Sequence, residues 1–444
     1  MAKSNLEKIR EAGIVGAGGA GFPTHIKIAN KASVIIANGA ECEPLLRVDR
    51  QMMETFPEKI VEGLQVVMRI SNAEKGVICL KEKYHQAADR LSEVLKNKKR
   101  IELHFIGNYY PAGDEQQLVY EVTGKAVPTG GLPIDAGAIV CNVSTLINIA
   151  YAVEGTPVTH KYVTVNGSVG EPCTLNAPLG TPIQELIRAA KGPASESEGY
   201  TVIAGGPMMG RIENDWTVPV TKGLGGLIVL PSDHKLVMKK NASLDKEYRL
   251  AKSVCCQCNY CTQICPRNAL GLNVEPHKIM RAIGYGDPAT LGGANSIFSC
   301  CDCGLCTYYA CNMELSPGRM VTAVKNALLK KGVKPVKNIF GPVNAMREYG
   351  KVPVKRLIER LGLGKYDGEA PLQNETMQVD CVRIPLKQHI GAPAQPVVNP
   401  GDVVAEGDLI GAVAPEKVGA NVHASISGSV TAVNEQFVEI RVKG

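Results

Sequence analysis

The chain has 444 residues, enough for two to four domains, and its 45% hydrophobic and 21% charged residues exclude a largely disordered protein. A net charge of +6, from 49 basic and 43 acidic residues, is too small for a dedicated nucleic-acid binder, so we expect no nucleic-acid partner. The unusual count is 15 cysteines, which indicates either an extracellular disulfide protein or an intracellular metal protein.

The N-terminal segment, residues 1–12, favours an intracellular protein. It contains Glu7 and Glu11 and has no apolar core, so it does not have the pattern of a secretory signal. No stretch of the chain reaches the roughly 18 uninterrupted apolar residues that a membrane-spanning helix needs. We therefore expect a cytoplasmic protein that is not integral to a membrane, in which thiols stay reduced and disulfides are the weaker interpretation.

A glycine-rich segment, GIVGAGGAG (residues 13–21), follows a predicted short helix at residues 5–12. Backbone without Cβ atoms can lie against a planar ring or a phosphate. Taken alone the motif is weak, because glycine-rich turns are common and a dinucleotide-binding loop should follow a strand. The segment is therefore a candidate nucleotide site that needs support from its surroundings.

An α/β domain surrounds this segment. The predicted strands are 33–37, 76–80, 101–106 and 138–142, and the predicted helices are 87–96 and 143–152. The first strand leads into NGAECEP, a loop with two carboxylates. Loops at the carboxyl ends of parallel strands are where such sheets bind ligands.

The middle of the chain has a β-grasp pattern. Residues 162–190 predict a strand, an Asn166-Gly167 turn, a second strand and a helix that begins near Pro182. GGPMMG (residues 205–210) closes the unit, with Met208 and Met209 expected to pack at an interface. Residues 222–230 predict a further strand.

Ten of the fifteen cysteines lie between Cys255 and Cys311, in the runs CCQCNYCTQICP and CCDCGLCTYYAC. The first run contains the C-x2-C-x2-C-x3-C-P pattern of bacterial ferredoxins, and the second contains the same pattern with one extra residue before its last cysteine. In two-cluster ferredoxins the fourth ligand of each cluster comes from the other run. We therefore predict two [4Fe–4S] clusters, one held by Cys255, Cys258, Cys261 and Cys311 and the other by Cys300, Cys303, Cys306 and Cys265.

Cys256 and Cys301 interrupt the two-residue spacing, and we interpret them as bystanders, although a register with Cys256 as a ligand stays open. Asn312 stands where many such runs have proline. A pair of structural zinc sites is the alternative, but zinc normally needs two cysteine pairs separated by a longer loop. Three close cysteines and a trailing one favour iron–sulfur clusters.

The C-terminal part begins with a basic, proline-containing segment at 333–373 that reads as a docking linker. From residue 377 onward, short strands and glycine turns predict a small all-β unit. It resembles the barrel-sandwich hybrid fold of lipoyl and biotin carriers. Lys417 lies near the position of a carrier lysine but lacks the usual flanking pattern, so its modification stays open.

Four segments, GAGGAGFPTHIK, NGAECEP, YPAGDE and CNVSTLINIA, occur in this order and resemble the flavin domain of the Rnf complex C subunit. The flavoprotein subunit of respiratory complex I is a more distant relative. The resemblance covers nearly the whole chain and implies that FMN is bound and that NADH donates electrons. It implicates around FMN the residues Gly16, Gly18, Gly19, Gly21, Lys27, Asn38, Glu41, Tyr110, Gly113, Asp114, Asn142 and Thr145. It gives Phe22, Glu43 and Glu115 as candidates for NADH.

Two positions depart from the complex I pattern. Ala40 stands where that loop has an acidic residue, and Cys141 stands where it has a paired asparagine. The resemblance therefore implies fewer flavin contacts, and it supports FMN more firmly than NADH. Without it, the acidic residues of these loops would be read as solvated.

The resulting fold class is multidomain, with an α/β domain, a β-grasp domain, a helical two-cluster ferredoxin-like domain and a C-terminal barrel-sandwich hybrid. The expected divisions are 1–157 (FMN and NADH), 158–213 (β-grasp), 214–249 (connecting segment), 250–332 (clusters), 333–376 (linker) and 377–444 (barrel-sandwich hybrid). In the Rnf C subunit the barrel-sandwich module usually comes first, whereas here it comes last. That order resembles the cobalamin reductases of the propanediol-utilisation microcompartment, a branch of the same flavo-iron–sulfur family.

This resemblance implies an NADH-dependent oxidoreductase that reduces cob(III)alamin or cob(II)alamin inside a bacterial microcompartment. No D-x-H-x-x-G motif occurs, so cobalamin would be a substrate or the cofactor of a partner enzyme, and a shell protein would be a further partner. One alternative is a soluble Rnf C-like subunit that passes electrons between NADH and ferredoxin, flavodoxin or another reductase. A second alternative is a non-catalytic scaffold with structural clusters.

Overall fold

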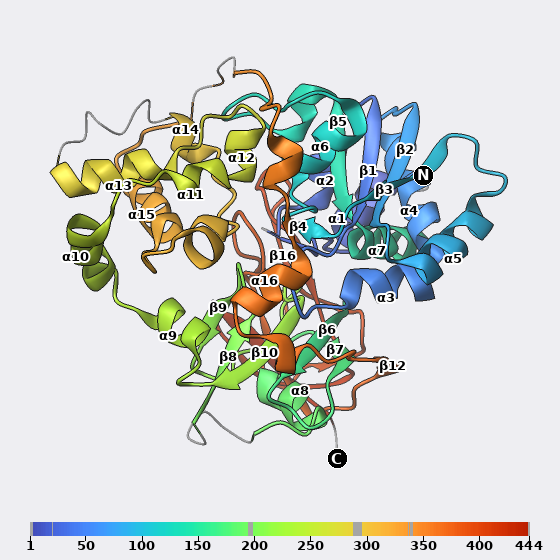
Figure 1. Ribbon diagram of the computed structural model, residues 1–444. Helices are drawn as coiled ribbons and strands as arrows, with labels where there is room; N and C mark the ends of the chain where they lie inside the picture. Colours follow the sequence, from blue (N-terminus) through green and yellow to red (C-terminus); the bar gives the residue numbers. More distant parts are fainter. Residues whose placement is uncertain are drawn as a thin grey trace.

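The computed structural model describes residues 3–19, 21–193, 199–286, 295–335, 337 and 341–442 (Figure 1). The N-terminal α/β domain, blue to cyan in Figure 1, lies on one side of the molecule, and the yellow helical domain lies on the opposite side. The green sheet of the middle region lies below both. Within the described residues, no helix is both long and apolar enough to cross a lipid bilayer.

A four-stranded parallel sheet, in the order β3-β2-β1-β5, forms the centre of the N-terminal domain. Its strands are β1 (Val34–Gly39), β2 (Lys75–Lys81), β3 (Ile101–Ile106) and β5 (Ala138–Asn142), which confirms the four predicted strands. β1 and β5 are apolar and buried along almost their whole length because helices cover both faces of the sheet.

The helices of this domain form two layers around the sheet. They are α1 (Asn5–Glu11), α2 (Thr24–Ile28), α3 (Val48–Thr55), α4 (Pro57–Ile70), α5 (His85–Leu95), α6 (Glu115–Thr123) and α7 (Val143–Glu154), with the short η1 (Pro133–Ala136). Buried residues of α1, α3, α4, α5 and α7 share one apolar core with one face of the sheet. Leu118 and Val119 of α6 pack on the other face. The domain is therefore a three-layer α/β/α unit, as its alternating pattern predicts.

The middle region forms a six-stranded sheet in the order β12-β7-β6-β10-β8-β9. Its strands are β6 (His160–Gly167), β7 (Cys173–Pro178), β8 (Tyr200–Ala204), β9 (Arg211–Glu213), β10 (Gly226–Pro231) and β12 (Leu372–Thr376), and α8 (Ile183–Ala189) follows β7. β6 and β7 form the predicted antiparallel pair. Two segments expected as connectors, 214–249 and 333–376, thus each supply a strand of this sheet.

The prediction of a turn at Asn166-Gly167 is wrong, because both residues belong to the end of β6. The Asn166 side chain donates to the carbonyls of Leu45 and Gly368, at 3.1 and 3.0 Å. Gly167 pairs with Val229 of β10. These contacts from distant parts of the chain override the local turn preference of the dipeptide.

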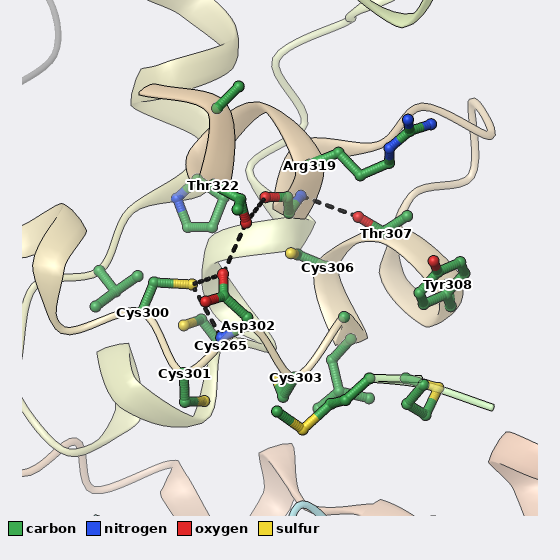
Figure 2. A pocket seen from close by; sticks show the side chains of 18 of the residues that line it. Cys265, Cys300, Cys301, Asp302, Cys303, Cys306, Thr307, Tyr308, Arg319 and Thr322 are labelled. Atoms are coloured by element: carbon green, nitrogen blue, oxygen red, sulfur yellow. Dashed lines mark hydrogen bonds between the residues drawn. The ribbon is translucent and has the colours of Figure 1, made fainter. Parts of the chain in front are cut away.

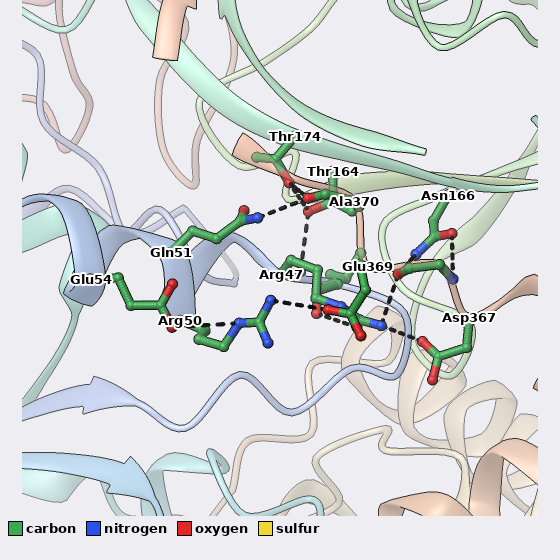
Figure 3. A network of polar contacts seen from close by, with 12 residues as sticks. Arg47, Arg50, Gln51, Glu54, Thr164, Asn166, Thr174, Asp367, Glu369 and Ala370 are labelled. Atoms are coloured by element: carbon green, nitrogen blue, oxygen red, sulfur yellow. Dashed lines mark hydrogen bonds and ion pairs between the residues drawn. The ribbon is translucent and has the colours of Figure 1, made fainter. Parts of the chain in front are cut away.

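A polar network joins the α/β domain to this sheet through residues 367–370 (Figure 3). Arg47, just before α3, forms an ion pair with Asp367, and its backbone N–H donates to Thr164 Oγ1 of β6 at 3.1 Å. Gln51 of α3 donates to the carbonyl of Ala370 at 2.8 Å. The segment around η6 (Gly364–Tyr366) therefore fixes the two domains against each other.

The cysteine-rich region is helical between its two runs, as predicted. Its helices are α10 (Leu244–Val254), α11 (Tyr260–Gln263), α12 (Pro266–Ala269), α13 (Pro276–Tyr285), α14 (Asn295–Phe298), the π-helix η4 (Cys306–Ala310) and α15 (Pro317–Lys330), and α9 (Lys235–Asn241) leads into it. Apolar residues of α10, α13 and α15 form the core of this domain. After α15 the chain returns to the α/β domain, where β11 (Val352–Pro353) pairs with β4 (Tyr109–Tyr110), between η5 (Arg347–Gly350) and α16 (Val354–Arg360).

The C-terminal module is all-β, as predicted, and consists of two small sheets. One contains β13 (Cys381–Pro385), β15 (Val403–Val404), β18 (Gly428–Val433) and β19 (Phe437–Arg441), and the other contains β14 (Gln395–Pro396), β16 (Leu409–Ala412) and β17 (Val422–His423). Buried Val382, Ile410 and Val438 belong to the core that the sheets share. Lys417 lies on an exposed turn between β16 and β17.

Candidate cofactor sites

The carboxyl edge of the parallel sheet is the first candidate site. The chain runs from β1 outward to β2 and β3, and then returns to β5 on the other side of β1. Such a reversal of strand order is the point at which open α/β sheets bind ligands. Asn38 and Asn142 lie side by side there because β1 and β5 pair in that register. The loops that follow these two strands therefore border one ligand-binding position.

The glycine-rich loop lies across this edge, at the start of α7. The N–H of Ala17 donates to Thr145 Oγ1 at 3.0 Å. A Cβ added to Gly18 would lie 2.7 Å from Asn142 Nδ2, whereas a Cβ added to Gly19 would meet no atom of the described residues within 4 Å. The loop is thus packed against β5 and α7 at Gly18 and open at Gly19.

These residues fit FMN. The open space at Gly19 leaves room beside the loop, and Ser144 Oγ, at the start of α7, is buried with no hydrogen-bond partner among the described residues. A phosphate at a helix start accepts hydrogen bonds from such a hydroxyl and from exposed backbone N–H groups. Ser144 was not among the predicted contacts, although its position in CNVSTLINIA directly after the strand is a usable signal.

The two asparagines at the edge hold neighbouring loops in place. Asn142 Nδ2 donates to Asp49 of α3 at 2.9 Å, and Asn142 Oδ1 accepts from the N–H of Ser144 at 2.8 Å. Asn38 Nδ2 donates to the carbonyl of Gly113 at 3.0 Å. The two asparagine side chains therefore hold the Gly113 loop, α3 and the start of α7 in place around the site.

Lys27 and Glu115 form an ion pair, with Nζ and Oε1 2.6 Å apart. Both side chains are partly exposed, and Phe22, five residues before Lys27 in the sequence, is 37% exposed. Gly16 and Gly21 shape the backbone of the glycine-rich loop next to Phe22. Gly16 N–H donates to the carbonyl of Phe22 at 3.0 Å, and Gly21 has a left-handed φ of 65°.

Two buried lysines at the site were missed by the sequence analysis. Lys161 Nζ donates to the carbonyl of Ala17 in the glycine-rich loop at 2.9 Å. Lys81 Nζ donates to the carbonyl of Glu41 at 2.8 Å. Burial lowers the pKa of each lysine to about 8. The signal that could have revealed them is a lysine at the end of an otherwise apolar strand.

Glu41 is buried below the start of α3, where its carboxylate accepts from the N–H of Asp49 at 3.1 Å. Burial, followed by the nearby charge of Asp49, raises the pKa of Glu41 to about 7. A carboxyl group with this environment carries its proton in the folded protein at pH values where it has lost it in the unfolded chain.

Replacing Glu41 with glutamine should flatten the pH dependence of stability. In the unfolded chain the glutamate pKa is near its ordinary value, so the favourable contribution of this group is full below about pH 4.5 and disappears as pH rises through about 7. The wild-type protein should therefore lose about 1–3 kcal/mol more than E41Q between pH 5 and pH 8. Urea unfolding across this range measures the difference, with exposed Glu58→Gln as the control. Equal slopes for E41Q and wild type would contradict the assignment.

Three residues predicted to contact FMN or NADH lie at domain interfaces, namely Glu43, Tyr110 and Asp114. Both carboxylate oxygens of Glu43 accept backbone hydrogen bonds, from Met208 and Met209 at 2.8 Å each. Tyr110 is buried, and its hydroxyl donates to the carbonyl of Cys303 at 2.8 Å. Glu43 therefore binds the GGPMMG turn of the middle region, and Tyr110 binds the cysteine-rich domain.

Asp114 also faces the cysteine-rich domain. It forms a buried ion pair with Arg267 of α12, with Oδ1 and Nη2 2.5 Å apart and Oδ2 and Nε 2.8 Å apart. Only 9% of the Asp114 side chain and 11% of the Arg267 side chain are exposed. The loop that joins β4 to α6 therefore binds the α/β domain to the cysteine-rich domain.

A cavity of about 450 Å³ is lined by all four cysteines predicted for one cluster (Figure 2). These are Cys265, Cys300, Cys303 and Cys306. Burial raises the pKa of Cys265 to about 12, so its thiolate needs the positive charge of bound iron. Two cysteine runs that are 35 residues apart in the sequence thus meet around one volume, which fits a [4Fe–4S] cluster.

The other four predicted ligands lie near one another. The pKa of Cys261 is raised to about 12, first by burial and then by the charges of Cys255, Cys311 and Cys258. Cys258 is exposed, whereas Cys303 is buried against the α/β domain. We call Cys255, Cys258, Cys261 and Cys311 the outer set, because it reaches the protein surface. Cys265, Cys300, Cys303 and Cys306 are the inner set, which lies at a domain interface.

The two bystander cysteines differ in position. Cys256 is exposed beside the outer set, and Cys301 lines the cavity together with the inner set. The four thiolates of a four-iron cluster each ligate a different iron atom, so they are spaced around the cluster and do not converge on one point as the ligands of a single ion do. Within the described ranges, no three His, Cys, Asp or Glu side chains converge as the ligands of a single metal ion would.

Family models match four parts of the chain. Residues 9–151 match the Nuo51 FMN-binding domain, 162–212 the SLBB domain, 254–316 the 4Fe-4S dicluster domain and 367–443 the RnfC barrel sandwich hybrid domain. The predicted combination of FMN and iron–sulfur domains is confirmed, and the dicluster match argues against a pair of zinc sites. The protein is therefore a flavo-iron–sulfur oxidoreductase.

Three curated proteins give the relationship. Cobalamin reductase PduS of Salmonella typhimurium (strain LT2) is 40% identical over 435 residues, 98% of this chain and 95% of the relative. Cobalamin reductase PduS of Citrobacter freundii is 39% identical over 99% of this chain and 96% of the relative. The C subunit of the Na(+)-translocating ferredoxin:NAD(+) oxidoreductase complex of Acetobacterium woodii is 36% identical over 61% of this chain and 59% of the relative. The chain belongs to the cobalamin reductase PduS family.

Proposed function

We propose that this protein is an NADH-dependent reductase of cob(III)alamin and cob(II)alamin that works inside a bacterial microcompartment. The observation that carries the proposal is the full-length similarity to two proteins named cobalamin reductase, with the four domains in the expected order. When bound, FMN accepts an electron pair as hydride and releases the electrons singly. A one-electron acceptor such as cobalamin needs that conversion.

The proposed FMN site is the carboxyl edge of the parallel sheet. The glycine-rich loop, with Gly18 and Gly19, forms one wall, and Asn142, Ser144 and Thr145 form the floor at the start of α7. Lys27 and Glu115 border the exposed side, where a nicotinamide nucleotide would approach. The buried ammonium of Lys161 supports the loop from below and adds positive charge beside a phosphate-bearing ligand.

The two proposed cluster sites differ in their distance from this edge. The inner set is tied to the α/β domain by the hydrogen bond from Tyr110 to the carbonyl of Cys303. The outer set includes exposed Cys258. We therefore assign the inner set to the flavin side and the outer set to the side where an acceptor, either free cobalamin or a cobalamin-handling enzyme, would dock.

A soluble Rnf C-like electron carrier is the second candidate function. It is favoured by the 36% identity to the C subunit of a ferredoxin:NAD(+) oxidoreductase complex. In this case ferredoxin or flavodoxin would exchange electrons with the same surface, and the cofactors would stay unchanged.

The test is a comparison of acceptors with the anaerobically purified protein. We expect about eight irons and one FMN per chain, and bleaching of the flavin absorbance by NADH. Faster NADH-dependent reduction of cobalamin than of ferredoxin or flavodoxin supports the first function, and the reverse order supports the second. A flavin that NADH does not bleach would contradict NADH dependence.

Replacing Gly19 with alanine should weaken FMN binding at least tenfold without unfolding the protein. Within the part of the chain that the structure describes, the added methyl group meets no atom within 4 Å, so it would occupy space that the proposed site leaves to the ligand. Gly284→Ala in α13 is the matched control, because its Cβ also meets no atom and it lies far from the flavin loop in the sequence. Titration of the FMN-free protein by flavin fluorescence gives both affinities. Unchanged FMN affinity in G19A would place FMN elsewhere.

A further inference from the structure

Lys222 is a buried ammonium group without a carboxylate partner. Its side chain is 3% exposed, and Nζ donates to two backbone carbonyls, those of Gly13 and Asn421, at 2.7 Å each. Among the described residues, no acidic side chain lies within ion-pair distance of Nζ. Burial alone lowers the pKa of Lys222 to about 7. Burying an ammonium group without an opposite charge costs free energy, which the hydrogen bonds to the two carbonyls must offset.

The two carbonyls belong to different domains. Gly13 begins the glycine-rich loop, Asn421 lies in the C-terminal module, and Lys222 itself comes from the segment between β9 and β10. A Cβ on Gly13 would lie 2.2 Å from the Asn421 carbonyl oxygen, and Gly13 has a left-handed φ of 68°. One ammonium group therefore joins three parts of the chain at a contact that only glycine allows.

The C-terminal module also holds the other end of the loop. The N–H of Ile390 donates to the carbonyl of Gly21 at 3.2 Å, and a Cβ on Gly21 would lie 3.3 Å from the carbonyl oxygen of Gln388. The side chain of Gln388 accepts from the N–H of Lys222 at 3.0 Å. Both ends of the glycine-rich loop are thus tied to the module and to Lys222.

We propose that the C-terminal barrel-sandwich module locks the glycine-rich loop in its FMN-binding conformation, with Lys222 as the positioning residue that connects them. This inference rests on the proposed flavin site. A loop with five glycines loses much conformational freedom when it becomes ordered, so a ligand binds it more tightly if the loop is already held. The module then acts as a fixed wall of the flavin domain, and its exposed Lys417 turn is not needed for this role.

The experiment is an FMN titration of the FMN-free Lys222→Met protein, combined with amide hydrogen exchange of residues 13–21. We expect FMN to bind at least tenfold more weakly and the loop amides to exchange faster, because the hydrogen bonds to both carbonyls are lost. At saturating FMN, the rate at which NADH bleaches the flavin should equal that of wild type. This separation of affinity from rate is what a positioning role requires.

Lys240→Met is the matched control. Lys240 is also largely buried and donates to two carbonyls, those of Met208 and Gly210, but it lies away from the flavin loop. Its FMN affinity should stay at the wild-type value. Unchanged FMN affinity in K222M, with normal binding by the wild type, would overturn the inference and leave the proposed function intact. Failure of the wild type to bind FMN would overturn the proposed flavin site.

Hydrogen exchange of the wild-type protein decides the question if K222M does not fold. Adding FMN should protect residues 13–21 and also residues 388–391 and 420–423 of the module, because Ile390 bonds the loop directly and Asn421 is joined to it through Lys222. Protection confined to the α/β domain would overturn the inference.

Discussion

Replacing Cys303 with serine should remove about four of the eight irons expected per chain, whereas replacing Cys301 should remove none. Both cysteines line the same cavity and are two residues apart, so the pair is internally controlled. Cys303 continues the C-x2-C-x2-C spacing from Cys300 to Cys306, and Cys301 interrupts it. Loss of one thiolate leaves a four-iron cluster with an incomplete ligand set at a buried interface.

Iron analysis and electron paramagnetic resonance of the reduced proteins measure the outcome. C303S should lose one of two cluster signals and its NADH-dependent transfer to any acceptor, while NADH still bleaches the flavin. Cys255→Ser against Cys256→Ser makes the same comparison in the outer set and decides the register left open by the sequence. Loss of iron in C301S with retention in C303S would contradict the proposed ligand set.

The strands of the α/β domain could be predicted because a parallel sheet covered on both faces needs continuous apolar runs. Val34–Gly39 and Ala138–Asn142 have such runs, and the turn of strand order between them locates the candidate site. The cysteine spacing likewise selected Cys265, Cys300, Cys303 and Cys306, which line one cavity, because the geometry of a cluster constrains short loops. The apolar runs and the spacing within each cysteine run are local patterns, and local patterns can be read from a sequence.

The parts that could not be predicted depend on contacts between distant segments. Asn166-Gly167 has the composition of a turn, yet it ends a strand because Leu45, Gly368 and Val229 pair with it. Strand β12 pairs with β7 of the middle sheet directly after residues 367–370, which bind the start of α3. In both cases the tertiary partner outweighs the local preference.

Buried polar groups were the other gap. A lysine at the end of an apolar strand suggests burial, but the sequence does not show which distant backbone carbonyls Lys81, Lys161 and Lys222 bind. The family resemblance gives Glu43 as a candidate for NADH, and the sequence does not show that its carboxylate accepts two N–H groups of the GGPMMG turn. Charge in a loop predicts exposure unless a distant partner compensates its burial.

Replacing Arg267 with methionine should be the most damaging single change outside the cysteines. It would leave the Asp114 carboxylate buried at the interface without the two N–H donors that now bind both of its oxygens. Breaking a buried pair in this way costs about 3–5 kcal/mol of stability. Arg188→Met is the control, because Arg188 pairs with Glu185 on the surface with its side chain 71% exposed, and such pairs contribute about 1 kcal/mol or less.

A double-mutant cycle separates the pair from the general effect of losing an arginine. Asp114→Asn with Arg267→Met should be more stable than the sum of the single changes predicts, because the double variant no longer buries an uncompensated charge. Urea unfolding of all four proteins gives the coupling, and rapid mixing with NADH shows whether electrons still leave the flavin. In R267M the flavin should bleach normally but reoxidise slowly, since Arg267 and Asp114 hold the α/β domain against the helix that follows Cys265. Additive effects with unchanged reoxidation would mean that this ion pair does not set the contact between the two domains.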